Sequence, residues 1–121
     1  SGLFNVMNVD MNLPLTIVEG PIDSLCISNS IALQGATKLN DYFDDIKKVR
    51  FLFDNDKIGK EHSMNKLKSN KKVFLWGLYL KKMNIKSTNI KDINDIIKLN
   101  AFNTEIYESC FSDDEFDILY I

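Results

Sequence analysis

The sequence predicts an α/β protein with a mostly parallel central sheet and helices on both faces. Three observations favour this class: short apolar, β-branched segments recur along the chain, helical patterns separate them, and polar or glycine-containing turns close them. The 121 residues are enough for one domain with its own core, and 45% apolar with 26% charged residues is typical of a folded chain rather than a disordered one.

The first part of the chain carries two of the expected strands. Residues 15–18 are apolar and partly β-branched, which predicts a buried strand that ends at Glu19-Gly20-Pro21. Proline suits the first turn of a helix, so residues 21–29 are expected to be helical. Residues 31–33 form the second strand, which Gln34-Gly35 closes.

The middle of the chain carries the clearest strand. Thr37 can cap a helix whose apolar face is formed by Leu39, Tyr42, Phe43 and Ile46. Residues 49–53 then predict a strand that stops at Asp54-Asn55-Asp56, and residues 58–69 have helical spacing.

The last part of the chain is expected to hold one more strand and one short helix. Residues 72–76 predict the fourth strand, with Phe74 and Trp76 in the core, and Asp92 can cap a helix that buries Ile93, Ile96 and Ile97. The segment 99–121 is acidic but contains enough aromatic and aliphatic residues to form a packed terminal element.

Charge is distributed unevenly. Residues 1–65 carry 6 bases and 9 acids, residues 66–98 carry 9 lysines and 2 acids, and residues 99–121 carry 6 acids and no base. The basic middle block can attract phosphate, although lysines also commonly coat exposed helix faces. Arg50 is the single arginine, so bidentate reading of nucleic-acid bases is not expected.

Several classes of protein are excluded or disfavoured. No apolar run approaches the roughly 20 residues of a membrane span, and no signal peptide is visible, so we expect a cytoplasmic protein, in the host cytoplasm if it comes from a phage. Cys26, Cys110 and His62 cannot form a four-ligand zinc site, and both thiols are expected to be reduced and buried. His62 is interpreted as a surface helix residue. Ser1-Gly2 resembles a cleavage scar, which suggests a piece of a longer protein.

Acidic residues follow the predicted strands. In a parallel sheet, ligands bind at the carboxyl edge of the strands, where Glu19, Asp54 and Asp56 fall, and the fold can bring Asp92 to the same edge. Asp54 and Asp56 lie two residues apart in an extended segment, so both carboxylates lie on one side of it. All-oxygen ligands favour Mg²⁺ or Mn²⁺ over zinc. The alternative is that these acids are ordinary turn and helix-cap residues.

Three motifs in this order resemble the Toprim domain that bacterial-type primases, topoisomerases and some nucleases share. They are Glu19-Gly20-Pro21-Ile22-Asp23, then Phe53-Asp54-Asn55-Asp56-Lys57-Ile58-Gly59, then Lys91-Asp92-Ile93-Asn94. Residues 3–6 also resemble the strand that leads into this domain. Within the superfamily the chain looks most like a tailed-phage primase subunit. The resemblance covers residues 3–98 and implies a Toprim-like, Rossmann-like sheet.

The resemblance implies roles for particular residues. Glu19 matches the catalytic glutamate, and Asp54, Asp56 and Asp92 match the ligands of Mg²⁺ or Mn²⁺. The residues that could contact nucleotide or template are Gly20, Lys57, Lys60, Lys91 and Asn94. Asn94 stands where many bacterial primases have Asp, and Asp23 is interpreted as an acid favoured by a helix N-terminus.

The implied function is the metal-binding catalytic core of a DNA primase, which makes RNA primers by nucleotidyl transfer. Its implied partners are a single-stranded DNA template, nucleoside triphosphates and, in the full protein, a replicative helicase; no membrane is involved. The chain contains neither the zinc ribbon nor the second, basic half of a primase polymerase domain, so we expect little primer synthesis by this fragment alone.

Three alternatives stay open. The chain can be a Toprim nuclease or topoisomerase fragment, or a non-catalytic module that docks within a replisome. Residues 49–58 also resemble the strand and D-x-D motif of HAD-type phosphatases, with Asp54 as nucleophile, although Ile58 stands where Thr or Val is expected.

Overall fold

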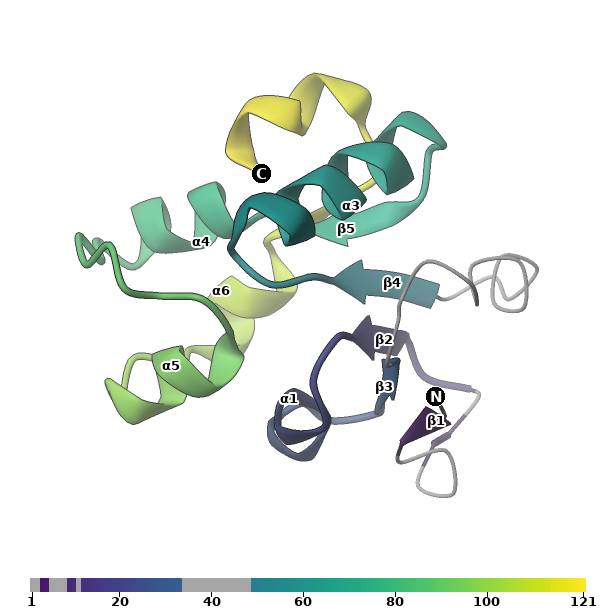
Figure 1. Ribbon diagram of the computed structural model, residues 1–121, viewed down its shortest axis with the longest axis horizontal. Coiled ribbons are helices and arrows are strands. Elements are labelled where there is room, and N and C mark those ends of the chain that lie inside the picture. Colours follow the sequence, from purple (N-terminus) through teal and green to yellow (C-terminus); the bar gives the residue numbers. More distant parts are fainter. Residues whose placement is uncertain (1–2, 5–8, 11, 34–48) are drawn as a thin grey trace.

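The computed structural model describes residues 3–4, 9–10, 12–33 and 49–121, and in this part of the chain six strands form one sheet (Figure 1). The strand order is β1-β3-β2-β4-β5-β6. The central strands β3, β2, β4 and β5 are parallel, whereas β1 and β6 pair antiparallel at the two edges. The strands are β1 (Leu3–Phe4), β2 (Leu15–Val18), β3 (Ser30–Leu33), β4 (Val49–Leu52), β5 (Lys72–Phe74) and β6 (Phe111–Ser112). The predicted α/β class with a mostly parallel sheet is confirmed.

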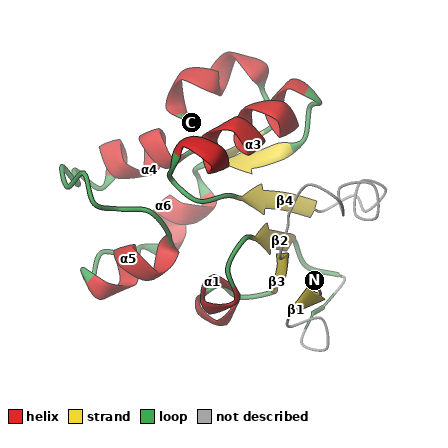
Figure 2. Cartoon of the chain, viewed as in Figure 1, coloured by secondary structure: helices red, strands yellow, loops and turns green. Residues whose placement is uncertain are grey.

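Helices cover both faces of the sheet (Figure 2). The helices α3 and η2 pack on one face, and α1, α4, α5 and α6 supply the core of the other. Their bounds are α1 (Pro21–Cys26), α3 (Lys57–Lys68), α4 (Trp76–Lys82), α5 (Ile93–Lys98), α6 (Thr104–Glu108) and the 3₁₀ helix η2 (Glu115–Tyr120).

The two faces follow from the alternation of side chains along the strands. Val18 and Leu52 belong to the cluster that packs against α1, α4, α5 and α6. Ile17 and Phe51, one residue earlier on each strand, belong to the opposite cluster with Leu67 of α3. A strand buried on both faces reads as a continuous apolar run, which is why the sequence of β2 showed no alternation.

The order of the parallel strands places a switch point between β2 and β4. After β2 the chain moves outward through α1 to β3, and it then returns to the other side of β2 to form β4. Connections that leave in opposite directions put their helices on opposite faces, and the strand ends at the reversal leave a crevice where ligands bind. The residues that follow β2 and β4 therefore define the first place to look for a site.

The helix predicted for residues 21–29 is shorter, because α1 ends at Cys26. Asn29 has a left-handed backbone with φ of 53° and cannot continue a helix. Its side-chain amide donates to the carbonyl oxygens of Asp10 and Pro14, at 3.0 and 2.9 Å, and so ties the turn to the segment that enters β2.

The strand predicted for residues 72–76 is also shorter, and this part of the prediction was wrong for Trp76. The strand β5 ends at Phe74, and Trp76 begins α4. The buried indole Nε1 donates to the carbonyl oxygen of Phe53 at 2.8 Å, which satisfies a backbone group just beyond β4. The expected core position of Phe74 and Trp76 is nevertheless confirmed.

The terminal segment adds an edge strand and packs only in part, because Ile118 and Ile121 lie against the core whereas Phe116 and Leu119 are 91% exposed. Strand β6 pairs with β5, and Tyr107, Cys110 and Phe111 join the aromatic cluster around Phe74. Arg50 of β4 forms two hydrogen bonds to the Glu108 carboxylate, at 2.6 and 2.9 Å, and its guanidinium lies 4.1 Å from the centre of the Phe111 ring. The single arginine thus holds the terminal segment on the sheet.

Other expectations have mixed outcomes. The helix predicted after Thr37 lies outside the described residues. Cys110 is buried and Cys26 is half-buried, and neither forms a disulfide. His62 is half-buried rather than on the surface, with its ring at the edge of Phe53. Across the described part of the chain, no helix combines the length and the apolar character that crossing a membrane requires.

Candidate functional site

Glu19 and Asp54 meet at the switch point. Glu19 directly follows β2, and Asp54 lies two residues after β4. The backbone N–H of Asp54 donates to Oε1 of Glu19 at 2.9 Å. The strands that precede them are buried and paired in register, so this contact is set by the core of the fold rather than by a flexible loop.

Asp56 and Gly59 shape the turn from β4 into α3. Asp56 is the N-cap of α3, and its Oδ1 accepts from the Gly59 N–H at 2.7 Å. A methyl group on Gly59 would collide with the carbonyl oxygen of Asp54, so glycine is required there by a close backbone approach. The cap and the close approach at Gly59 together fix the turn between β4 and α3.

The segment before α5 is fixed by a capping box. Oδ1 of Asp92 accepts from the Asp95 N–H at 2.9 Å, and Oδ2 of Asp95 accepts from the N–H groups of Asp92 and Lys91, at 3.3 and 2.8 Å. Asp92 therefore has the capping role that the sequence predicted. The Lys91 ammonium lies 3.9 Å from Oδ2 of Asp56, which brings this segment beside the D-x-D turn.

Asp23 connects two groups of acids, Glu19 with Asp54 and Asp92 with Asp95. It is buried in α1, and its Oδ1 accepts from the Asn94 N–H at 3.4 Å. Burial and the neighbouring Asp92 raise the pKa of Asp23 to about 6, with smaller contributions from Asp95 and Glu19. Asp23 thus lies close enough to Asp92, and also to Glu19 and Asp54, for their charges to interact.

Among the predicted ligands, Asp54 has the largest shift in pKa. Burial raises its pKa to about 7, and the negative charges of Glu19, Asp23 and Asp56 add to this, while Lys91 opposes it. Carboxylates that crowd together in this way either take up a proton or share a cation.

The donor chemistry and the charge of this edge fit a hard divalent cation. All the candidate ligands are carboxylates, which Mg²⁺ and Mn²⁺ prefer. Within the residues that the structure describes, no three or more Asp, Glu, His or Cys side chains are arranged so as to hold a metal ion. Binding of such a cation would require rotation of carboxylates that now make other contacts, such as the cap of α3 by Asp56.

The residues predicted to contact nucleotide lie in three places. Lys91 and Asn94 lie beside the acids through the contacts described above. Lys57 and Lys60 lie in the first turns of α3 with exposed side chains. Gly20 is the N-cap residue of α1 and would accept a methyl group, which would lie 3.6 Å from Oδ2 of Asp23.

Comparison of the chain with protein-family models gave no match, and comparison with curated proteins gave none.

Sequence reasoning missed two residues of this edge. Asp23 lies in the first turn of α1, as expected for an acid at a helix N-terminus, but its burial close to Asp92 and Glu19 was not predicted. Asn55 was given no role, yet its backbone and side chain both bond to the segment before Asp92. The signal available for both was their position inside a matched motif, four residues after Glu19 for Asp23 and between Asp54 and Asp56 for Asn55.

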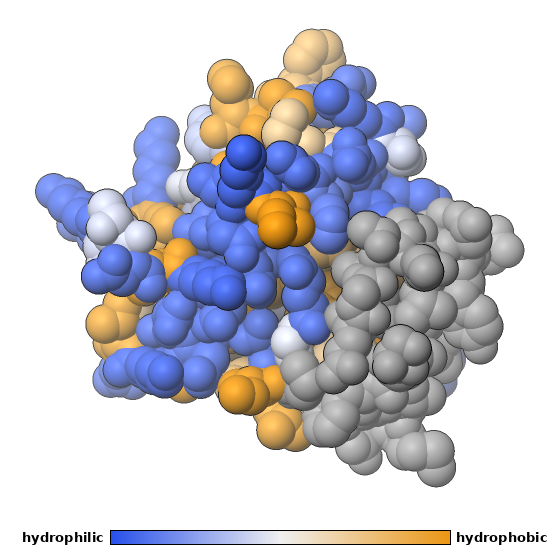
Figure 3. Space-filling model, in the orientation of Figure 1, coloured by the Kyte–Doolittle hydropathy of each residue, from blue (hydrophilic) through white to orange (hydrophobic). Residues whose placement is uncertain are grey.

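Unlike Lys91, three other lysines of the basic block make contacts away from the acids. Lys66 lies over the ring of Phe51, Lys81 over that of Tyr120, and Lys82 bonds to Ser109. Figure 3 shows hydrophilic residues over most of the described part of one face, with apolar groups at its upper, left and lower margins and one near its middle. The basic block is therefore spread over several elements, as the alternative of solvated helix faces predicts.

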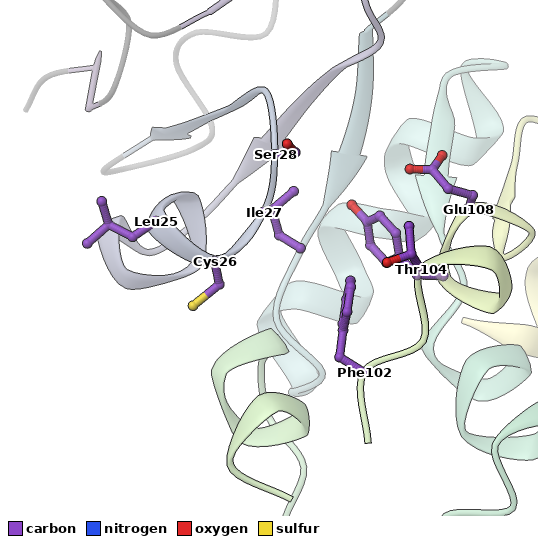
Figure 4. Close-up of a pocket in the computed structure, with 8 residues that line it drawn as sticks. Leu25, Cys26, Ile27, Ser28, Phe102, Thr104 and Glu108 are labelled. Atoms are coloured by element: carbon purple, nitrogen blue, oxygen red, sulfur yellow. The ribbon is translucent and has the colours of Figure 1, made fainter. Parts of the chain in front are cut away.

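A separate pocket of about 390 Å³ lies between the end of α1 and the start of α6 (Figure 4). Its lining comprises Leu25, Cys26, Ile27, Ser28, Phe102, Thr104, Tyr107 and Glu108. None of the predicted metal ligands lines it, so we assign the candidate chemistry to the acidic edge and not to this pocket.

Proposed function

We propose that the chain is the metal-binding core of a DNA primase with a Toprim-like fold, which joins ribonucleotides by nucleotidyl transfer on a single-stranded DNA template. The observation that carries the proposal is the meeting of Glu19 with Asp54 across the switch point, where burial and the charges of Glu19, Asp23 and Asp56 raise the pKa of Asp54 to about 7. Two of the three motifs that resemble primases supply these acids, and the third supplies Asp92.

In this proposal, Glu19, Asp54 and Asp56 hold Mg²⁺ or Mn²⁺, and Asp92 contributes from the neighbouring segment. The excess of negative charge around Asp54 supports this assignment, because a divalent cation would relieve it. When bound, the cation would polarise the phosphate oxygens and offset the charge that develops on the leaving group.

The reaction joins a 3′-hydroxyl to an α-phosphate and releases pyrophosphate. Glu19 is the residue proposed to accept the hydroxyl proton, because its other contact, from the Asp54 N–H, fixes the orientation of its carboxylate. Lys91 is proposed to contact the triphosphate, since its ammonium already lies 3.9 Å from Asp56 on an exposed side chain. Its neighbour Asn94 would meet the nucleotide or the template from the start of α5.

Primer synthesis by the complete protein that contains this chain tests the proposal. The assay uses single-stranded DNA, labelled ribonucleotides and Mg²⁺, with wild type, Glu19→Gln and Asp54→Asn, and Glu61→Gln as a matched control on the exposed side of α3. We expect primers from wild type and control, and a loss of about 100-fold or more in the two site variants. The isolated chain is expected to make few primers because it would not hold the template.

Other outcomes favour the other functions. Nicking of supercoiled DNA without primer synthesis, lost in the same variants, would indicate a nuclease or topoisomerase fragment. Neither activity, with no binding of Mg²⁺ or Mn²⁺ at millimolar concentration, would indicate a docking module. A phosphoryl analogue trapped on Asp54 would indicate a HAD-type phosphatase.

A further inference from the structure

Asn55 joins two segments that are 35 residues apart in the sequence. Its backbone N–H donates to the carbonyl oxygen of Lys91 at 2.6 Å, and its side-chain amide donates to the carbonyl oxygen of Ile90 at 2.8 Å. Residues 85–92 form neither a helix nor a strand, so these carbonyls are outside any regular hydrogen-bonding pattern. Asn55 therefore supplies two neighbouring hydrogen bonds that fix this segment against the D-x-D turn.

The contacts around Asn55 fix the backbone of Lys91. Ile90 and Ile93 are both buried in the same core cluster, and their burial anchors the segment to the core. The Lys91 N–H donates to Oδ2 of Asp95, and its carbonyl accepts from Asn55. The backbone of Lys91 is thus held on both sides, while its side chain stays 60% exposed and reaches to 3.9 Å from Asp56.

The side chain at position 55 has to be a donor. An aspartate of the same shape would present a carboxylate to the Ile90 carbonyl oxygen and would add a third negative charge between Asp54 and Asp56. An alanine would keep the backbone bond to Lys91 but would lose the bond to Ile90. The amide of asparagine meets both requirements, since it is neutral and donates.

We propose that Asn55 is a positioning residue that holds the Lys91 ammonium beside Asp56, where it receives the phosphates of an incoming nucleoside triphosphate. This inference rests on the proposed function and adds the residue that acts through Lys91. It predicts that Asn55 affects nucleotide affinity through Lys91 and leaves metal affinity largely unchanged, because its bonds are to the carbonyl oxygens of Ile90 and Lys91, whereas the carboxylate of Asp92 is fixed separately by the capping box with Asp95.

A double-mutant cycle measures this directly. The dissociation constant of Mg²⁺–ATP is determined by calorimetry for wild type, Asn55→Ala, Lys91→Ala and the double variant, and that of Mn²⁺ is determined without nucleotide. We expect Asn55→Ala to weaken Mg²⁺–ATP binding about three- to tenfold, the range of one lost hydrogen bond. In the Lys91→Ala background the same change is expected to have an effect below about twofold. Mn²⁺ binding is expected to stay within about twofold of wild type.

Matched controls come from α3. Asn65→Ala and Lys68→Ala make the same chemical changes on exposed positions of that helix and are expected to bind Mg²⁺–ATP as wild type does. Thermal unfolding of every variant shows whether it is folded. If Asn55→Ala does not fold, Asn55→Ser, which keeps a donor on a shorter side chain, replaces it in the same cycle.

The outcomes separate this inference from the proposed function. Additive effects of the two substitutions, or equal losses of Mn²⁺ and Mg²⁺–ATP affinity, would overturn the inference and leave the proposed function standing. No effect of Lys91→Ala on Mg²⁺–ATP would overturn the inference together with the triphosphate contact proposed for Lys91, and would leave the proposed metal site standing. Failure of the wild-type chain to bind either Mn²⁺ or Mg²⁺–ATP would overturn both.

Discussion

Strand β4 has charged side chains near its start and just beyond its end, and their surroundings differ. Near the start, Arg50 is almost buried and donates two hydrogen bonds to Glu108, which lower the pKa of that carboxyl. Beyond the end, burial and three neighbouring acids raise the pKa of Asp54 to about 7, with one lysine in opposition. The first region is a balanced ion pair, and the second has an excess of negative charge.

The difference separates a structural role from a functional one. A charge with its partner at hydrogen-bond distance stabilises the fold, and here it attaches the terminal segment to the sheet. Acids that repel one another cost stability in the absence of a cation, and such sites are usual where a protein binds metal or transfers protons. The following changes break or sharpen this comparison, from the largest expected effect to the smallest.

Gly59→Ala is expected to disrupt the acidic region most. The added methyl group would collide with the backbone of Asp54, which cannot move without shifting the turn, so we expect a loss of about 3 kcal/mol in the free energy of unfolding. Urea unfolding measures it. Gly20→Ala is the control, because its methyl group would make an ordinary contact of 3.6 Å. Equal stability of Gly59→Ala and wild type would contradict the geometry of the turn.

Glu108→Gln is expected to break the balanced region. The neutral amide leaves the buried Arg50 guanidinium without its counter-charge, so we expect a loss of about 2 kcal/mol. Urea unfolding at pH 7 compares it with Glu105→Gln, which makes the same change on an exposed position of α6. A loss no larger than that of the control would show that Arg50 does not depend on Glu108.

Asp54→Asn is expected to have the opposite sign. The pKa values of Asp54 and Asp23 are raised to about 7 and about 6. The contribution of these two groups to the free energy of unfolding is therefore fully present below pH 3.8 and is lost as the pH rises to about 7. Removal of one of these charges is therefore expected to raise the stability of the metal-free chain by about 1 kcal/mol at pH 8, after screening by solvent.

The pH dependence of the two regions sharpens this test. The pKa of Glu108 is lowered, so its contribution is present above its ordinary pKa of 4.5 and is lost as the pH falls. Urea unfolding between pH 4 and 8, with chelator present, is expected to show a shallower fall with rising pH in Asp54→Asn than in Asp113→Asn, the matched change on an exposed residue of the terminal segment. Identical profiles would contradict the perturbation of Asp54.

Asn94→Asp is expected to give the smallest change. The added carboxylate lies in the residue whose N–H bonds to Asp23, so it increases the repulsion among these acids and is expected to cost about 0.5 kcal/mol without metal. Millimolar Mn²⁺ is expected to remove this cost. Asn89→Asp, exposed in the preceding loop, is the control, and thermal unfolding with and without Mn²⁺ measures both. A cost that Mn²⁺ leaves unchanged would place residue 94 outside the metal site.

Local patterns in the sequence predicted the four parallel strands and the acids that follow β2 and β4, but not the edge strand β6, because apolar runs and strand ends are properties of neighbouring residues. The start of a helix at Trp76 was not predictable, since it depends on a bond from the indole to Phe53, 23 residues earlier. The same holds for the ion pair of Arg50 with Glu108 and for the bonds of Asn55 to Ile90 and Lys91. Contacts over such distances depend on the order of strands in the sheet.

The most direct test of the central claim is to locate Mn²⁺ by its anomalous scattering in crystals of the wild-type chain and of Asp54→Ala/Asp56→Ala, soaked with the metal at neutral pH. The account predicts a Mn²⁺ peak within bonding distance of Glu19, Asp54 and Asp56 in the wild type, and no peak there in the variant. A wild-type crystal in which these carboxylates are open to solvent and hold no Mn²⁺ would contradict it.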